Sequence, residues 1–97
     1  MLQEIKDRLG ANFVSGDDNV LLDIIDDMTL IASNTTNREI TDTKLEPYVK
    51  KAVISEYLRR GDEGSKSSSE GSLSTSYDDI ENKLRKDLVR NGLRLLK

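Results

Sequence analysis

The stretch Val20–Ala32, VLLDIIDDMTLIA, is the longest apolar-rich segment of this 97-residue chain. Its apolar residues recur at the spacing of one helix face, namely Leu21, Ile24, Ile25, Met28 and Ala32. Leu22 and Ile31 widen that face, and the aspartates fall on the other side. The pattern predicts a core helix over about residues 18–35, with Asp17 or Asp18 as its N-terminal cap. Because three aspartates interrupt the segment, it cannot span a bilayer.

A short amphipathic helix is predicted ahead of this segment. Leu2, Ile5 and Leu9 recur at helical spacing, and Gly10 is placed to end the helix. The residues that follow, ANFVSGDD, read as a loop. We expect Phe13 to be buried beneath that loop.

A third helix is predicted within TDTKLEPYVKKAVISEYLRRG, residues 41–61. Thr43 and Glu46 have the spacing of a capping box, and Pro47 suits the first turn because its missing N–H would have no partner there. Gly61 is expected to end the helix. The side that faces the core carries four apolar residues, with Glu56 at its margin: Val49, Ala52, Val53 and Tyr57.

A fourth helix and a short tail are predicted over about residues 78–97. Ser76, Asp78 or Asp79 would cap this helix, and Asn91–Gly92 would end it. Its apolar stripe is only three residues wide: Ile80, Leu84 and Leu88. The tail that follows carries three leucines: Leu93, Leu95 and Leu96. So narrow a stripe and so apolar a tail suggest docking against another protein.

The segment between the third and fourth helices, GDEGSKSSSEGSLSTSYDD (residues 61–79), has the composition of a flexible linker. Its second half also alternates with period two, because Leu73, Thr75 and Tyr77 are separated by serines behind a turn at Gly71. This alternation predicts a β-hairpin over about residues 65–77. An isolated hairpin is marginally stable. It would be disordered in a lone subunit, or ordered by pairing with neighbouring copies.

The composition restricts the possible chemistry. The chain has no cysteine and no histidine, which removes disulfides, thiol nucleophiles, the common zinc ligands and the usual general base. It also has no phosphate-cradling or nucleophile-elbow motif. We therefore expect a protein that is not an enzyme and that needs no metal or cofactor. With no signal peptide evident, we expect a soluble, intracellular protein.

These patterns predict an all-α fold in a single domain, residues 1–97. It would be a small bundle of about four helices, with a Ser/Gly-rich loop or β-hairpin at about 61–77 between helices 3 and 4. The C-terminal helix and tail would occupy about 78–97. Only 35% of the residues are hydrophobic, so the core of a lone subunit would be thin and oligomerisation would add buried surface.

The net charge of −3 is unevenly distributed, because acidic residues crowd the second helix and basic residues crowd the C-terminal one. Two solvated helix faces would explain this pattern, and so would contact between opposite poles of neighbouring copies. The basic helix leaves a small helical DNA- or protein-binding regulator as an alternative function. The acidic chain and the long turn between helices 2 and 3 weigh against sequence-specific DNA binding.

The order of these segments resembles the small head–tail connector (adaptor) proteins of tailed bacteriophages and prophages. The most specific part is LEPYVKKAVISEYLRRGDEG (45–64), followed by SSSEGSLSTSYDD (67–79) and a short helix ending in arginines and leucines. The resemblance implies a structural subunit of the virion, assembled in the host cytoplasm, which forms a cyclic ring of about twelve copies. The implied partners are the other copies, the portal protein above and a tail-completion or stopper protein below. Genome DNA would pass through the ring without sequence-specific binding.

The resemblance also points to the loop and the C-terminal segment as the parts that contact the portal or neighbouring subunits. The candidate residues are Glu63, Gly64, Gly71, Leu73, Thr75, Tyr77, Arg90, Leu93, Leu95 and Leu96. On the second helix, Asp23, Asp26 and Asp27 are candidates for the channel wall, because negative side chains repel DNA phosphates.

Overall fold

The computed structural model describes residues 1–63 and 77–95. These residues form α1 (Leu2–Leu9), α2 (Asp18–Thr36), α3 (Glu46–Glu63) and α4 (Tyr77–Arg90), with the 3₁₀ helices η1 (Gly10–Asn12) and η2 (Thr43–Leu45). Within this part of the chain there is no strand. The prediction of an all-α fold with four helices is confirmed.

The predicted hairpin lies almost entirely on residues 64–76, outside the described residues. Its last predicted position is the exception. Tyr77 was expected at the end of a strand, but it is the first residue of α4. The strand prediction is therefore wrong at Tyr77. One reason is that Asp78 and Asp79 fall in the first turn of α4, where acidic side chains favour the helix N-terminus.

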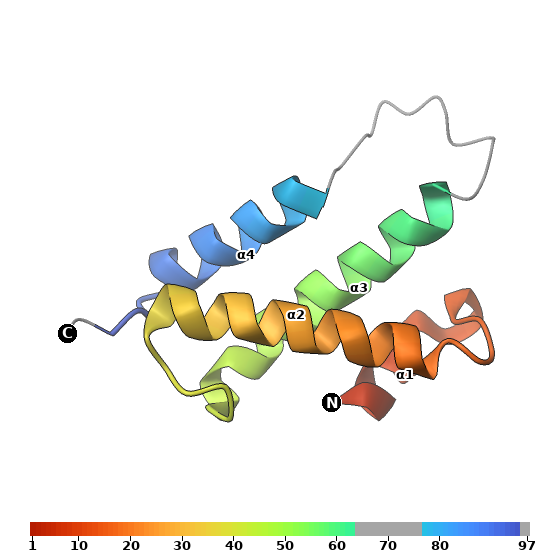
Figure 1. Ribbon diagram of the computed structural model, residues 1–97, viewed down its shortest axis with the longest axis horizontal. Helices are drawn as coiled ribbons and strands as arrows, with labels where there is room; N and C mark the ends of the chain where they lie inside the picture. The colour runs from red at the N-terminus through yellow and green to blue at the C-terminus, as the bar shows by residue number, and fades with distance from the viewer. Residues whose placement is uncertain (64–76, 96–97) are drawn as a thin grey trace.

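Helices α3 and α4 run side by side in opposite directions, and α2 crosses and packs against both of them (Figure 1). Helix α1 packs against α2 and α3. Two ion pairs fix it there: Lys6 Nζ lies 3.2 Å from Asp18 of α2, and Lys50 Nζ of α3 lies 3.1 Å from Glu4. The four helices therefore enclose one core rather than two.

The core helix α2 is confirmed, and it ends one residue beyond the predicted boundary. Its buried residues share the predicted face: Leu21, Ile24, Met28 and Ala32. Ile25 and Ile31, predicted on the same face, are only half-buried. The prediction that Leu22 widens this face is wrong, because Leu22 keeps 43% of its surface exposed. Asp17 holds the N-cap position but makes no capping hydrogen bond. Its carboxylate instead accepts a 2.6 Å hydrogen bond from the Tyr57 hydroxyl of α3.

Tyr57 also joins the loop after α1 to the core. Its hydroxyl oxygen accepts the Val14 N–H at 3.0 Å, and its ring stacks on Phe13 with the centroids 6.1 Å apart. Burial, reinforced by the hydrogen bond to Asp17, raises the pKa of the Tyr57 hydroxyl. Phe13 is half-buried rather than fully covered, and Lys6 Nζ lies 5.1 Å from its ring centroid.

Helix α3 differs from its prediction at both ends. Asp42, not Thr43, provides the cap: its carboxylate accepts the Lys44 N–H at 2.9 Å and starts η2, which leads into α3. Pro47 lies in the first turn of α3, as predicted. Gly61 does not end the helix, which continues to Glu63. A glycine inside a helix costs only about 1 kcal/mol relative to alanine, so it need not stop one.

The narrow apolar stripe of α4 is covered by the chain's own helices. Ile80, Leu84 and Leu88 are all buried in the common core with residues of α2 and α3. The expectation that this stripe docks on another protein is therefore wrong. Three residues suffice because α4 needs to fill only the space left between α2 and α3. Two ion pairs between residues four positions apart lie on its exposed side, at 3.4 Å for Lys83–Asp87 and 3.5 Å for Arg85–Glu81.

Glu56 is fully buried, with 0% of its surface exposed, although the sequence placed it at the margin of the core. Its carboxylate pairs with the next turn of α3, at 2.8 Å from Arg59 Nη2 and 2.7 Å from Arg60 Nε. Burial by itself raises the pKa of a carboxyl group, but the hydrogen bonds and charges of the two arginines outweigh that effect. The pKa of Glu56 therefore lies below its ordinary value of 4.5.

This lowered pKa makes the stability of the chain depend on pH. Because the unfolded chain binds this proton more readily, the contribution of Glu56 to the free energy of unfolding is complete above about pH 4.5 and is lost as pH falls through the lower, folded-state pKa. Glu56→Gln should lower the free energy of unfolding by about 1–3 kcal/mol at pH 7. It should also remove the part of the pH dependence of stability that comes from Glu56. Urea unfolding measured from pH 7 to pH 3 tests this. Glu39→Gln, at an exposed position, is the control. If the free energy of unfolding falls with pH equally in the wild type and in Glu56→Gln, the role assigned to the lowered pKa of Glu56 is contradicted.

Candidate functional site

The C-terminal tail is held against the end of α2 and the turn that follows it. The Leu95 N–H donates to the Thr36 carbonyl at 2.7 Å, and Asn37 Nδ2 donates to the Leu95 carbonyl at 2.9 Å. Arg38 Nε donates to the Leu93 carbonyl at 2.6 Å. The tail backbone is therefore fixed, although it lies beyond the last helix.

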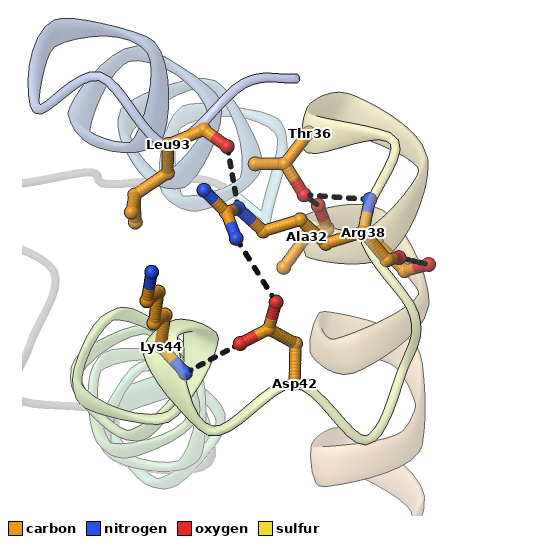
Figure 2. Close-up of polar contacts among 7 residues, drawn as sticks. Ala32, Thr36, Arg38, Asp42, Lys44 and Leu93 are labelled. Carbon is orange, nitrogen blue, oxygen red and sulfur yellow. Dashed lines mark hydrogen bonds and ion pairs between the residues drawn. The ribbon is translucent and has the colours of Figure 1, made fainter.

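Arg38 links this tail to the start of η2 (Figure 2). Its Nη1 donates to Asp42 Oδ2 at 3.0 Å, while the other oxygen of Asp42 accepts the Lys44 N–H. The Lys44 N–H, followed by the guanidinium of Arg38, holds the pKa of Asp42 below its ordinary value. One arginine thus joins a helix cap to the C-terminal segment.

The backbone that carries Arg38 is itself fixed by α2. The buried Thr36 hydroxyl donates to the Ala32 carbonyl at 2.7 Å and accepts the Arg38 N–H at 3.3 Å (Figure 2). Asn37 turns the chain with a left-handed φ of 62°, which asparagine tolerates better than most residues. We call Thr36, Asn37, Arg38 and Asp42 together the tail anchor.

The predicted tail residues differ in how exposed their side chains are. Leu93 is half-buried against the core. Leu95 keeps 43% of its surface exposed on a fixed backbone, and Arg90 is exposed at the end of α4. Leu96 lies outside the described residues. The tail anchor was not predictable from the sequence, because no spacing rule connects Arg38 to a carbonyl 55 positions away. The turn-forming residues after α2 were its only visible signal.

Two of the predicted loop residues belong to described helices, at the ends that border residues 64–76. Glu63 ends α3 and Tyr77 begins α4. The remaining loop candidates are Gly64, Gly71, Leu73 and Thr75, which are outside the described residues. Because α4 is 14 residues long, its two ends are about 20 Å apart at 1.5 Å per residue. The loop end and the tail end of α4 therefore form two separate candidate surfaces.

The three predicted aspartates share one exposed side of α2. At 100° per residue, Asp23, Asp26 and Asp27 fall within an arc of about 100°. Leu22 and Leu30, which are 43% and 55% exposed, lie beside them. None of the three aspartates has an ion pair within the described part of the chain. We call these five residues the acidic face.

A groove of about 70 Å³ lies between α3 and α4. Its floor is apolar and consists of Ala52, Ile80 and Leu84. Its rim is polar, with two lysines: Tyr48, Lys51, Ser55, Lys83 and Asp87. Lys83 pairs with Asp87, whereas Lys51 has no ion pair within the described residues. We call this the α3/α4 groove, and no sequence pattern predicted it.

Within residues 1–63 and 77–95, no group of three or more acidic, histidine or cysteine side chains is arranged to hold a metal ion. In the same residues, no helix has both the length and the apolar character to cross a membrane. Each buried side-chain nitrogen and oxygen of this part of the chain has a hydrogen-bond partner.

Comparison with models of known protein families matches residues 1–91 to the family described as Phage gp6-like head-tail connector protein. This match includes α1 to α4 and leaves only the last six residues outside. No curated protein and no solved structure gives a match.

The tail anchor predicts that Arg38 controls local opening of the C-terminal segment. Arg38→Met keeps the apolar stem of the side chain but removes the donor to the Leu93 carbonyl. If this hydrogen bond contributes roughly 1.4 kcal/mol to holding the tail closed, the Leu95 amide should exchange with solvent about tenfold faster. Hydrogen exchange followed by NMR measures this directly. Arg94→Met, on the exposed face of the same tail, should leave the rate unchanged. An unaltered Leu95 rate in Arg38→Met would show that Arg38 does not hold the tail.

Proposed function

The chain belongs to the phage gp6-like head–tail connector family, and on this premise we propose that it forms a ring beneath the portal of a phage head. The single observation that carries the proposal is the match over residues 1–91. It confirms the resemblance drawn from the sequence. A head–tail connector is a structural part of the phage particle, located where head and tail meet, and not an enzyme.

In the proposed assembly, about twelve copies form a closed ring, because heterologous contacts close into a ring when the rotation between copies divides a full turn. The ring extends the DNA channel of the portal and provides the docking surface for a tail-completion or stopper protein. The shape of the subunit supports this arrangement. It measures 46 × 28 × 17 Å, so a flat subunit can present two broad surfaces to its neighbours.

The candidate contact residues fall into two groups at opposite ends of α4. At the tail end, Leu95 presents an apolar side chain on an anchored backbone, and Arg90 is exposed at the end of α4. Both suit a contact with the portal or with a neighbour. At the loop end, the proposal keeps the residues predicted from the sequence: Glu63, Gly64, Gly71, Leu73, Thr75 and Tyr77. The separation of about 20 Å would allow one subunit to contact two partners at once.

The first prediction of this proposed function concerns assembly. The purified protein, sized by light scattering alone and with the portal of its own phage or prophage, should form a ring or assemble on the portal. The alternative, a helical regulator, would instead give a compact dimer that shifts a DNA duplex in a gel with steep salt dependence. A protein that stays monomeric with the portal, or that binds DNA as a dimer, would contradict the connector proposal.

The second prediction concerns the channel wall. If Asp23, Asp26 and Asp27 line the channel, their negative charges keep DNA phosphates from adhering and let the genome slide. Replacing all three with Asn should then slow or stall DNA ejection from assembled particles. Lys44→Gln, which changes an exposed charge on η2, is the control. Ejection kinetics equal to wild type would rule this role out.

A further inference from the structure

We propose that the acidic face of α2 on one copy docks into the α3/α4 groove of the next copy. This inference rests on the ring proposed above and names the two surfaces that would form it. Both surfaces belong to the described residues of one chain, and no other described residue covers either of them.

The two surfaces are complementary in chemistry. The acidic face offers two exposed leucines and three carboxylates without ion pairs in the described chain. The groove offers an apolar floor for the leucines, with Lys51 and Lys83 on opposite rims for the carboxylates. Lys86 and Arg90 continue the positive charge along the exposed side of α4. Such complementarity selects partners and orients their encounter.

The two surfaces also match in length. The groove residues run from Tyr48 to Ser55 on α3 and from Ile80 to Asp87 on α4, about 10 Å along each helix at 1.5 Å per residue. On α2, Leu22 and Leu30 are eight residues apart, about 12 Å along the helix. An amphipathic helix seated between two others is a common mode of recognition. The acidic face is therefore long enough to fill the whole groove.

Their positions on the subunit favour a ring. Because α2 packs against both α3 and α4, its exposed face and the outer groove between α3 and α4 lie on opposite sides of the three-helix unit. Lys51 and Ser55 accordingly fall on the side of α3 opposite the buried Val53. A contact between opposite sides repeats from copy to copy, and about twelve copies close if each contact turns the next subunit by about 30°.

This contact competes with the channel wall for the same aspartates. A water-filled channel leaves Leu22 and Leu30 in contact with water, whereas the groove removes them from it, and the removal of apolar surface favours association. The exposed leucines therefore favour the contact. The triple Asn variant separates the two roles. Failure to form rings indicates the contact, while complete rings with slow DNA passage overturn it.

Charge reversal provides the direct test, with ring formation on the portal read by light scattering. The acidic-face variant is Asp23→Lys with Asp26→Lys, and the groove variant is Lys51→Glu with Lys83→Glu. Each alone should weaken assembly at least tenfold, because like charges then meet across the contact. Circular dichroism of each variant confirms that it is folded.

The decisive test is whether combining the two charge reversals restores assembly. An equimolar mixture of the two variants should assemble, since each copy then meets a complementary neighbour on both sides. The chain that carries all four substitutions should assemble by itself. Exposed control pairs with the same charge changes should behave as wild type: Asp7→Lys with Glu39→Lys, and Arg8→Glu with Lys44→Glu.

Two results would overturn the proposal. The first is normal assembly of either single-surface variant, and the second is a mixture of folded variants that fails to assemble. In both cases, wild-type protein that still forms rings on the portal leaves the connector function intact. Wild-type protein that neither forms rings nor binds the portal overturns the connector function and this contact together.

Discussion

The structure depends on covering the apolar face of α2. This face holds the central residues of the core, and no single partner helix is wide enough to shield it, so α1, α3 and α4 all pack around it. Fourteen hydrophobic residues of the described chain are buried in this core, while others, Leu22 and Leu30 among them, stay exposed. The narrow stripe of α4 is a consequence, because α4 only completes a core that α2 and α3 already form.

The polar contacts act at the places where the chain leaves this core. Tyr57 and Asp17 fix the loop that enters α2, and the tail anchor fixes the turn that leaves it. Arg59 and Arg60 pair with the buried carboxylate of Glu56. Each of these contacts pairs a buried or half-buried polar group that would otherwise destabilise the fold. The core thus sets which helices meet, and the polar contacts set how their connections run.

Sequence periodicity could predict the helices and most of the core. The faces of α2 and α4 follow directly from the spacing of apolar residues, because burial of one side of a helix imposes that spacing. Periodicity alone could not reveal Glu56 as a core residue, because a charged side chain at a core position is stable only when its partners pair with it. The arginines one turn later were visible, but their spacing equally suits a helix C-terminus in solvent.

The candidate surfaces were predictable to different degrees. The acidic face could be predicted because its three aspartates lie close together in sequence, and a helix places them on one side. The α3/α4 groove and the tail anchor could not, since each joins segments far apart in sequence, and a single sequence does not show which distant segments meet. The cap at Asp42 was missed for a related reason: several residues near it could cap, and the choice depended on the contact with Arg38.

The separation of charge on the subunit follows from the same core. Once α2 turns its buried face inward, the aspartates of the acidic face must point outward, and they lie on the opposite side from the lysines that border the α3/α4 groove. A flat subunit with acidic and basic surfaces on opposite sides cannot satisfy both surfaces by pairing face to face with a single copy. Only a head-to-tail series, closed into a ring, covers both surfaces on every subunit. The constraint that folds the monomer thus also produces the two surfaces that the proposed ring would use.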